Sequence, residues 1–164
     1  MPIGEICTRE VIICNRSTNV LEAAQLMRRY HVGDLVIVEE SEGKRIPVGL
    51  ITDRDIVISV IAMQLDPTTI TAGDLISRDV VVISEDQGVF ETIERMRAHG
   101  VRRMPVVDQD GALAGIIAVD DLTELLAEEL TQLSKLISKE QTLEIEKKPG
   151  NFLGVASLGK SAGR

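Results

Sequence analysis

The chain has 164 residues, enough for one sizeable hydrophobic core or for two small cores that share an interface. Its hydrophobic content of 44% indicates a globular protein, and an aromatic content of 2% leaves a core of Ile, Val, Leu, Met and Ala. The net charge of −8 and the few aromatic rings argue against a nucleic-acid partner, which needs a basic face or stacking surfaces.

The first predicted strand is the apolar run at residues 11–14. It contains Cys14, which forms no CxxC pair with Cys7 and has no companion metal ligands. Both cysteines are therefore interpreted as small buried residues of a reduced, cytoplasmic protein. Ser17 and Thr18 are the expected N-caps of the next helix, because apolar residues then follow at helical spacing on one stripe: Val20, Ala24 and Met27.

Two further strands are predicted at residues 35–38 and 47–51, separated by a polar turn over residues 41–45. Thr52 then precedes a predicted helix over residues 53–63, which is apolar on nearly every side. A helix of that kind is expected to be buried on every side. In a domain this small its simplest partner is another subunit, so a homodimer is expected.

Residues 64–72 contain Asp66-Pro67 and three threonines, and are interpreted as a linker. The same order of elements then returns: a strand at 80–83, a helix from Val89 to Met96, strands at 104–107 and 113–118 around a turn, and a helix from Asp120.

The last helix keeps Leu and Ile at helical spacing to about residue 140. This stripe indicates either ordinary core contacts or a contact with a subunit or partner protein. Residues 147–164 are interpreted as a tail without its own core. The sequence has no signal-peptide pattern and no apolar run of about 18 residues, so no membrane span is expected.

The same order of elements occurs twice because the sequence contains an internal repeat. Residues 4–11 match residues 73–80 in size and polarity at an offset of 69, whereas the glycine motif at 49–55 matches 115–121 at an offset of 66. The first copy therefore carries three extra residues, which are expected in its polar turn. Two copies are too few for a solenoid and predict a pseudo-twofold pair.

The predicted fold is α/β (α+β), with two pseudo-twofold-related β-α-β-β-α repeats, small mixed sheets and a C-terminal helix. The predicted boundaries are residues 1–63 for the first repeat, 64–72 for the linker, 73–127 for the second repeat, 128–146 for the helical extension and 147–164 for the tail.

Two motifs, in register inside this repeat, resemble the tandem cystathionine-β-synthase-type (CBS) domain pair. One is Gly-hydrophobic-hydrophobic-Thr-x-x-Asp at 49–55, and the other is the run containing Val101, Arg102 and Met104 to Asp108. The resemblance covers residues 4–127. It implies a regulatory module, usually a disc-shaped dimer, that binds adenosine-containing ligands in clefts between the repeats. It does not imply catalysis.

Thr52 and Asp55 have two interpretations. An ionised carboxylate can accept hydrogen bonds from both hydroxyls of a ribose, and Asp55 falls in the first helical turn, where the helix dipole favours its charge. The Thr52 hydroxyl could face ribose or phosphate at the same helix N-terminus. The same pair also resembles a capping box that only starts the helix, and the two roles can coexist.

The family resemblance implies that the Asp55 cleft combines residues of both repeats. Arg102 and Arg103 are expected beside the ligand phosphates, because guanidinium groups match phosphate oxygens, although they could instead be a solvated surface pair. Arg54 is either a surface charge or a phosphate contact. The full set of expected ligand contacts in this cleft is Leu50, Thr52, Asp55, Ile76, Val81, Val101, Arg102 and Arg103.

A second cleft is implied around Asp121, but its residues depart from the family pattern. Ala118 lacks the hydroxyl of Thr52, and Asp34 is negative where its repeat equivalent, Arg103, is positive. The Asp55 cleft is therefore expected to take a phosphorylated adenosine ligand, and the Asp121 cleft to be weak, empty or selective for a less anionic ligand. The remaining expected walls of the Asp121 cleft are Ile12, Val32 and Gly33.

The leading hypothesis is a non-catalytic, cytoplasmic sensor of AMP, ADP, ATP or S-adenosylmethionine, whose altered packing a partner protein recognises. The alternative is a ligand-independent dimerisation or docking module in which Thr52 and Asp55 only cap a helix. No acid, base and nucleophile set indicates an enzyme. His31 and His99 each follow a helix, where cations are common, and no metal is expected.

Overall fold

The computed structural model describes residues 1–147 of the chain. These belong to two compact units, Met1–Glu124 and Leu125–Arg164. Of the predicted tail at 147–164, only Lys147 lies within the described residues, where it ends the last helix. Within residues 1–147, no helix is both long enough and apolar enough to cross a membrane.

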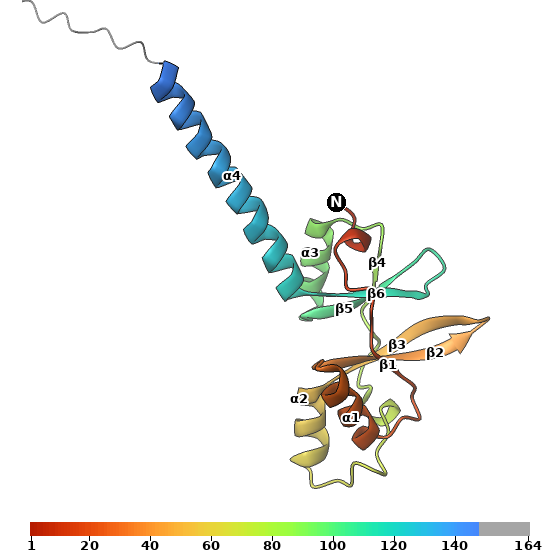
Figure 1. The fold of residues 1–164 in the computed structure, drawn as a ribbon. Helices are drawn as coiled ribbons and strands as arrows, with labels where there is room; N and C mark the ends of the chain where they lie inside the picture. Colours follow the sequence, from red (N-terminus) through yellow and green to blue (C-terminus); the bar gives the residue numbers. More distant parts are fainter. Residues whose placement is uncertain (148–164) are drawn as a thin grey trace, which may run out of the picture. The chain divides into compact units, whose positions relative to one another are not determined.

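The first repeat is built on a three-stranded mixed sheet in the order β1-β2-β3 (Figure 1). Strand β1 (Ile13–Cys14) is parallel to β2 (Asp34–Ser41), which is antiparallel to β3 (Lys44–Thr52). Helix α1 (Val20–Tyr30) connects β1 to β2, and α2 (Asp53–Ile56) follows β3.

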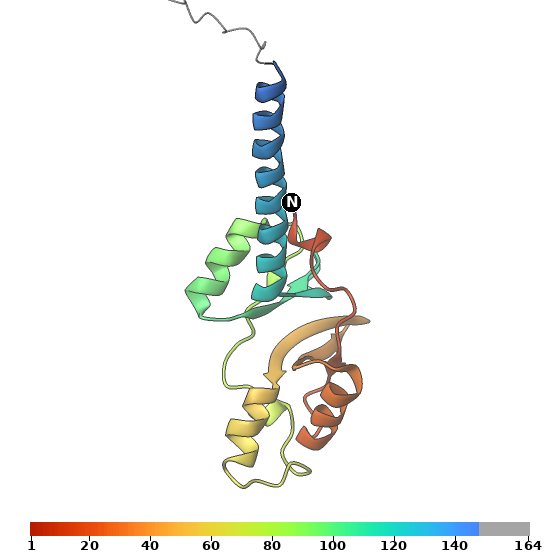
Figure 2. The same ribbon diagram turned by 60° about the vertical axis from the view of Figure 1, so that its left-hand side comes forward.

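The second repeat has the same order of elements and the same strand directions (Figure 2). Its elements are β4 (Ile83–Ser84), α3 (Val89–His99), β5 (Arg103–Val107), β6 (Leu113–Ala118) and the start of α4 (Val119–Lys147). The predicted fold class is therefore confirmed. β1 and β4 are shorter than predicted, because only Ile13 and Cys14, and in the second repeat Ile83 and the following Ser84, pair with the neighbouring strand.

Each repeat packs its opening segment on the other repeat. The 3-10 turn η1 (Ile3–Glu5) contributes Ile3 to the core of the second repeat, and Cys7 joins the same core. In turn, the segment around η3 (Gly73–Leu75) packs on the core of the first repeat. This exchange brings Ile76 close to the end of β3, because both contribute to the first core.

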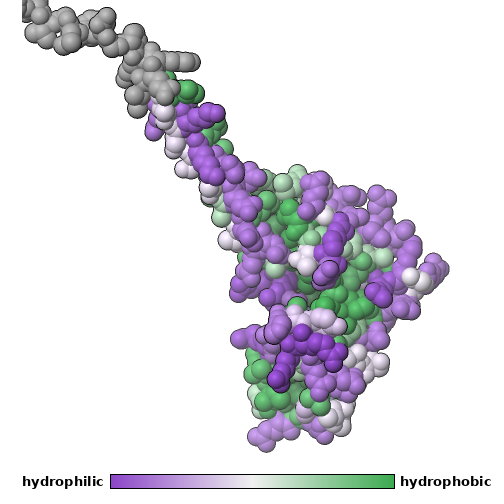
Figure 3. Space-filling view, in the orientation of Figure 1, coloured by the Kyte–Doolittle hydropathy of each residue, from purple (hydrophilic) through white to green (hydrophobic). Residues whose placement is uncertain are grey.

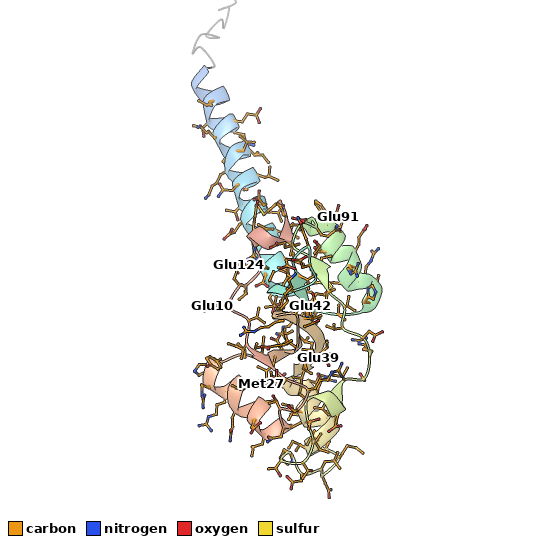
Figure 4. All side chains as sticks on the ribbon, turned by 90° about the vertical axis from the view of Figure 1, so that its right-hand side faces the viewer. Glu10, Met27, Glu39, Glu42, Glu91 and Glu124 are labelled. Carbon is orange, nitrogen blue, oxygen red and sulfur yellow. The ribbon has the colours of Figure 1, made fainter. Side chains whose placement is uncertain are left out.

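Helix α1 begins with a capping box at Asn19, so the predicted caps Ser17 and Thr18 are wrong. The Asn19 side chain accepts a hydrogen bond of 2.9 Å from Glu22 N. The Thr18 hydroxyl instead accepts a bond from Asn15 N. The predicted apolar stripe does face the core, where Met27, labelled in Figure 4, is buried.

The three extra residues of the first repeat lengthen its strands, whereas its turn is shorter than that of the second repeat. The predicted turn at 41–45 contracts to Glu42 and Gly43, both at positive φ, and Ser41 pairs with Lys44. A two-residue turn with both φ angles positive matches the twist of antiparallel strands. The hairpin of the first repeat is therefore longer than that of the second.

The helix after β3 continues from α2 as one π-helical segment, η2 (Val57–Ile61). Within the single chain only one side is buried, and burial of the rest against a second subunit stays a prediction. Ile56 and Val60 face the core, while Val57, Ile58 and Ile61 are 48–56% exposed. Figure 3 shows hydrophobic surface at the lower left, where Figure 1 places α2 and the segment that follows it.

Beyond Glu124, α4 belongs to the second unit and ends at Lys147, one residue beyond the predicted helical extension at 128–146. Its apolar residues recur at spacings of three and four, and they are exposed in the single chain. Those with large exposed side chains are Leu126, Leu130, Leu133, Leu136, Ile137 and Leu143.

Candidate functional site

A cavity of about 610 Å³ lies between the two repeats of the first unit. We call it the inter-repeat cavity. Its walls come from the end of β3 and the start of α2, the exchanged segment at 75–81, the start of β5 and the start of α4. The volume lies in the range of small-molecule sites.

The structure brings together all the residues predicted for the Asp55 cleft. The predicted residues on the walls of the inter-repeat cavity are Leu50, Thr52, Asp55, Ile76, Val81, Val101, Arg102 and Arg103. The sequence allows two roles for Arg54, a surface charge or a phosphate contact. Arg54 also lines the cavity. Asp121 is not among the lining residues, and its proposed ligand contact stays a prediction.

Thr52 and Asp55 form a capping box and line the cavity at the same time. Thr52 Oγ1 accepts a bond of 3.1 Å from Asp55 N, and Asp55 Oδ2 accepts bonds from Thr52 N at 2.9 Å and Thr52 Oγ1 at 2.8 Å. Within the described residues, Asp55 Oδ1 has no hydrogen-bond partner. One carboxylate oxygen therefore starts the helix, and the other remains available in the cavity.

The apolar part of the cavity depends on the absence of a side chain at Gly49. A Cβ atom built there would lie 2.8 Å from Ile76 Cδ1, closer than side chains tolerate. Gly49 thus lets Ile76 pack against β3, where it forms the cavity wall. In the second repeat, a Cβ atom built on Gly115 would lie 2.6 Å from Cys7 Sγ.

The charged residues on the cavity wall balance one another. Four arginines (Arg54, Arg78, Arg102 and Arg103) and four aspartates (Asp53, Asp55, Asp79 and Asp120) line the cavity. Arg102 and Asp120 form a loose, exposed ion pair at 3.8 Å. The cavity is therefore not strongly cationic, even though it contains the predicted arginine pair.

Arg103 is paired with its own repeat equivalent. Its Nε donates to Asp34 Oδ2 at 2.8 Å, and the side chains are 37% and 15% exposed, respectively. Burial raises the pKa of the Asp34 carboxyl, the Arg103 charge opposes that rise, and Asp53 and Asp121 add to it. The residues start β5 and β2, at positions related by the repeat offset.

Sequence reasoning missed several lining residues, half of them in the exchanged segment. Ser77, Arg78, Asp79 and Val80 all belong to the opening of the second repeat. The repeat itself marks this segment, because Arg78 aligns with Arg9. The sequence does not show that each opening segment packs on the other repeat. This packing makes the opening segment of the second repeat a wall of the cavity beside the first repeat.

Asp121 repeats half of the Asp55 arrangement. Its Oδ2 accepts a bond of 2.7 Å from Ala118 N, but Ala118 has no hydroxyl to complete the box. Its charge also acts on Asp34. The expected weakness of the Asp121 cleft toward anions stays a prediction.

The histidines and cysteines occupy structural positions in the described part of the chain. His31 ends α1 in the left-handed conformation, and His99 Nδ1 is 2.9 Å from the carbonyl oxygen of Arg95. Both thiols are buried and free, and burial raises the pKa of Cys14 to about 11. Among residues 1–147, no group of three or more His, Cys, Asp or Glu side chains could hold a metal ion.

Two curated relatives match most of the chain. An uncharacterised protein of Methanopyrus kandleri is 36% identical over 123 residues, 75% of this chain, which spans 61% of that protein's length. Hypoxic response protein 1 of Mycobacterium tuberculosis is 35% identical over 122 residues, which are 74% of this chain and 82% of the relative.

Two solved structures share the fold. Hypoxic Response Protein I, solved with two coordinated zinc ions, has a TM-score of 0.65 at 31% identity and covers 76% of this chain and 98% of its own. The CBS domain pair of protein MJ0100, in complex with 5′-methylthioadenosine and S-adenosyl-L-methionine, has a TM-score of 0.66 at 26% identity and covers 77% of this chain and 99% of its own.

The family model described as "CBS domain" matches residues 3–62 and again residues 72–128. These two matches take in both repeats and every residue that lines the inter-repeat cavity. The chain belongs to the CBS domain family.

Proposed function

We propose that the chain is a non-catalytic regulatory module that binds an adenosine-containing ligand in the inter-repeat cavity. The observation that carries the proposal is the convergence of Thr52, Asp55 and Ile76 on one cavity, although the sequence separates Ile76 from the other two. The ligand class is AMP, ADP, ATP or S-adenosylmethionine. A related CBS pair in complex with two adenosine derivatives supports this class.

Asp55 is the proposed ribose contact. Its Oδ1 has no hydrogen-bond partner among the described residues, and Asp55 lies in the first turn of α2 beside the cavity. Two vicinal hydroxyls can donate to one carboxylate, so a ribose suits this acceptor better than a deoxyribose. The capping bonds on Oδ2 hold the carboxylate in place for that contact.

The proposed adenine slot is the apolar wall made by Leu50, Ile76, Val81 and Val101. Flat apolar walls combined with a few polar groups are typical of nucleoside sites. The arginine side chains that line the same cavity would bind the 5′ substituent of the ribose. Ligand binding would then connect both repeats, because the slot and Asp55 come from different segments.

Isothermal titration with AMP, ATP and S-adenosylmethionine tests the proposal. We compare the wild type with Asp55→Asn and use Asp74→Asn as the matched control, since Asp74 makes the same capping bonds to Thr71 and does not line the cavity. Micromolar binding that Asp55→Asn abolishes and Asp74→Asn retains supports the function. No binding by the wild type would refute it for these ligands.

Dimerisation through the α2-η2 segment is the second proposed function, and it does not need a ligand. Val57, Ile58 and Ile61 form a continuous exposed apolar face, and Met63 just beyond is 66% exposed. A contiguous apolar patch on one chain is favourably covered by the same patch of a second copy around a twofold axis. The exposed stripe of α4 is the proposed contact for a partner protein.

A further inference from the structure

The ion pair between Asp34 and Arg103 changes the charge that the inter-repeat cavity presents to a ligand. Arg103 lines the cavity, whereas Asp34 is not one of its lining residues. Asp34 nevertheless contacts Arg103 Nε at 2.8 Å, and its side chain is only 15% exposed. Asp34 is mostly buried, so although Arg103 is 37% exposed, the contact offsets part of the Arg103 charge.

This offset matters because the wall has no excess of positive charge. The four lining arginines are already matched by four lining aspartates. Asp34 adds a fifth carboxylate at contact distance from one of those arginines. A ligand with several phosphates would therefore bring its charge to a wall that is neutral or slightly negative.

We propose that Asp34 is a specificity-determining residue that acts through Arg103 and lowers the affinity of the inter-repeat cavity for strongly anionic ligands. The cavity then favours adenosine ligands of small net charge, such as a monophosphate or an S-adenosyl compound, over the triphosphate. This inference rests on the proposed function, because it concerns which adenosine ligand binds at that site.

Comparison of the two repeats shows what an aspartate at position 34 changes. Asp34 and Arg103 occupy equivalent positions, so an arginine at both positions would place two cations beside each other near the pseudo-twofold axis. The aspartate converts that repulsion into an attraction. It therefore stabilises the contact between the repeats and at the same time removes one available cation from the cavity.

The test is a ligand series of increasing negative charge: adenosine, AMP and ATP, titrated into the wild type and Asp34→Asn. Removing one carboxylate charge near the ligand is expected to raise AMP affinity roughly three- to tenfold and ATP affinity further, with adenosine unchanged. Asp34→Glu should restore the wild-type order. A merely structural role would change the affinity of all three ligands together.

Asp110→Asn is the matched control for net charge. Asp110 forms an exposed ion pair with Lys44 at 2.7 Å on the hairpin turns and does not line the cavity. Its substitution changes the charge of the chain by the same amount, and should leave the ligand order unchanged.

The possible outcomes separate the two proposals. If adenosine or AMP binds and Asp34→Asn leaves the ratio of ATP to adenosine affinity unchanged, or lowers it, the role of Asp34 is overturned while the site stands. If no ligand of the series binds to the wild type or to Asp34→Asn, the proposed function fails, and the role of Asp34 fails with it.

Discussion

The side chain of Ile76 occupies the space that a methyl group on Gly49 would need, with 2.8 Å between Ile76 Cδ1 and the position of that Cβ atom. The two residues lie on different repeats in sequence and meet because the opening segment of the second repeat packs on the first. Gly49 is thus required by a close approach, not by an unusual backbone angle.

Gly49→Ala should therefore weaken both the fold and the ligand site. Overpacking of this kind typically destabilises by about 1–3 kcal/mol. Displacement of Ile76 should also narrow the inter-repeat cavity and lower the affinity for adenosine ligands. Chemical denaturation and titration calorimetry measure the two effects.

Gly115→Ala is the control for that substitution. Its Cβ would approach Cys7 Sγ at 2.6 Å, so a comparable loss of stability is expected, but neither residue lines the inter-repeat cavity. Equal losses of ligand affinity in both variants would mean that Ile76 has no specific role in the site.

The capping box at Thr52, which the second repeat lacks, predicts opposite effects on stability for substitutions at the two equivalent positions. Thr52→Ala should destabilise the chain by about 0.5–2 kcal/mol, because it removes an N-cap. The equivalent site in the second repeat has Ala118, and Asp121 already accepts from its backbone N–H.

Ala118→Thr should complete the second box and raise the free energy of unfolding by about 0.5–1 kcal/mol. Denaturant titration of the two single variants and the wild type measures both changes. A destabilising Ala118→Thr would show that the end of β6 cannot accommodate the hydroxyl that the end of β3 holds.

Much of the fold can be predicted from the sequence because the chain contains two copies of one repeat. The apolar runs, the helical stripe around Met27 and the offset between Gly49 and Gly115 indicate the repeat and its elements, and β6 has the predicted bounds. The N-cap of α1 is harder to predict, because Ser17, Thr18 and Asn19 are all good caps and only the backbone path selects Asn19.

The cavity was predictable only in part. Motif matching identifies Thr52 and Asp55, but the exchange of opening segments that adds Arg78 is a tertiary contact with no local signal. The same limit applies to Arg103. Its charge is visible in the sequence, whereas its pairing with Asp34 depends on how the two repeats meet.

The exposed face of α2-η2 predicts the oligomeric state. The wild type is expected to be a dimer, and Ile61→Glu a monomer, since a buried unpaired carboxylate at the interface is unfavourable. Light scattering coupled to size-exclusion chromatography gives the mass. The control is Leu136→Glu on α4, which should leave this dimer intact.

The opposite result for these two variants would assign the dimer interface to α4 instead of the α2-η2 segment. If Leu136→Glu dissociates the dimer and Ile61→Glu does not, the subunits associate through the exposed stripe of α4. A monomeric wild type would rule out the homodimer at the concentration measured.

Cys14 predicts a loss of stability at alkaline pH. Burial raises the pKa of its thiol from 9.0 to about 11, so the folded chain holds the proton more tightly than the unfolded chain. The free energy of unfolding should fall between about pH 9 and 11, by at most about 1.4 kcal/mol per pH unit from this group.

Cys14→Ala should lose that part of the pH dependence, whatever its effect on stability at neutral pH. Urea unfolding of both chains at pH 8, 9.5 and 10.5 provides the comparison, since every other titrating group is common to both. Parallel pH profiles would show that the thiol does not couple to folding.

Methyl NMR during a titration with AMP locates the ligand most directly. Binding in the inter-repeat cavity predicts large shifts for the methyl groups of Leu50, Ile76 and Val101, which line it. The methyl groups of Ile3 and Ile83, in the core of the second repeat, should change little. Large shifts confined to Ile3 and Ile83, or none at saturating AMP, would contradict the proposed site.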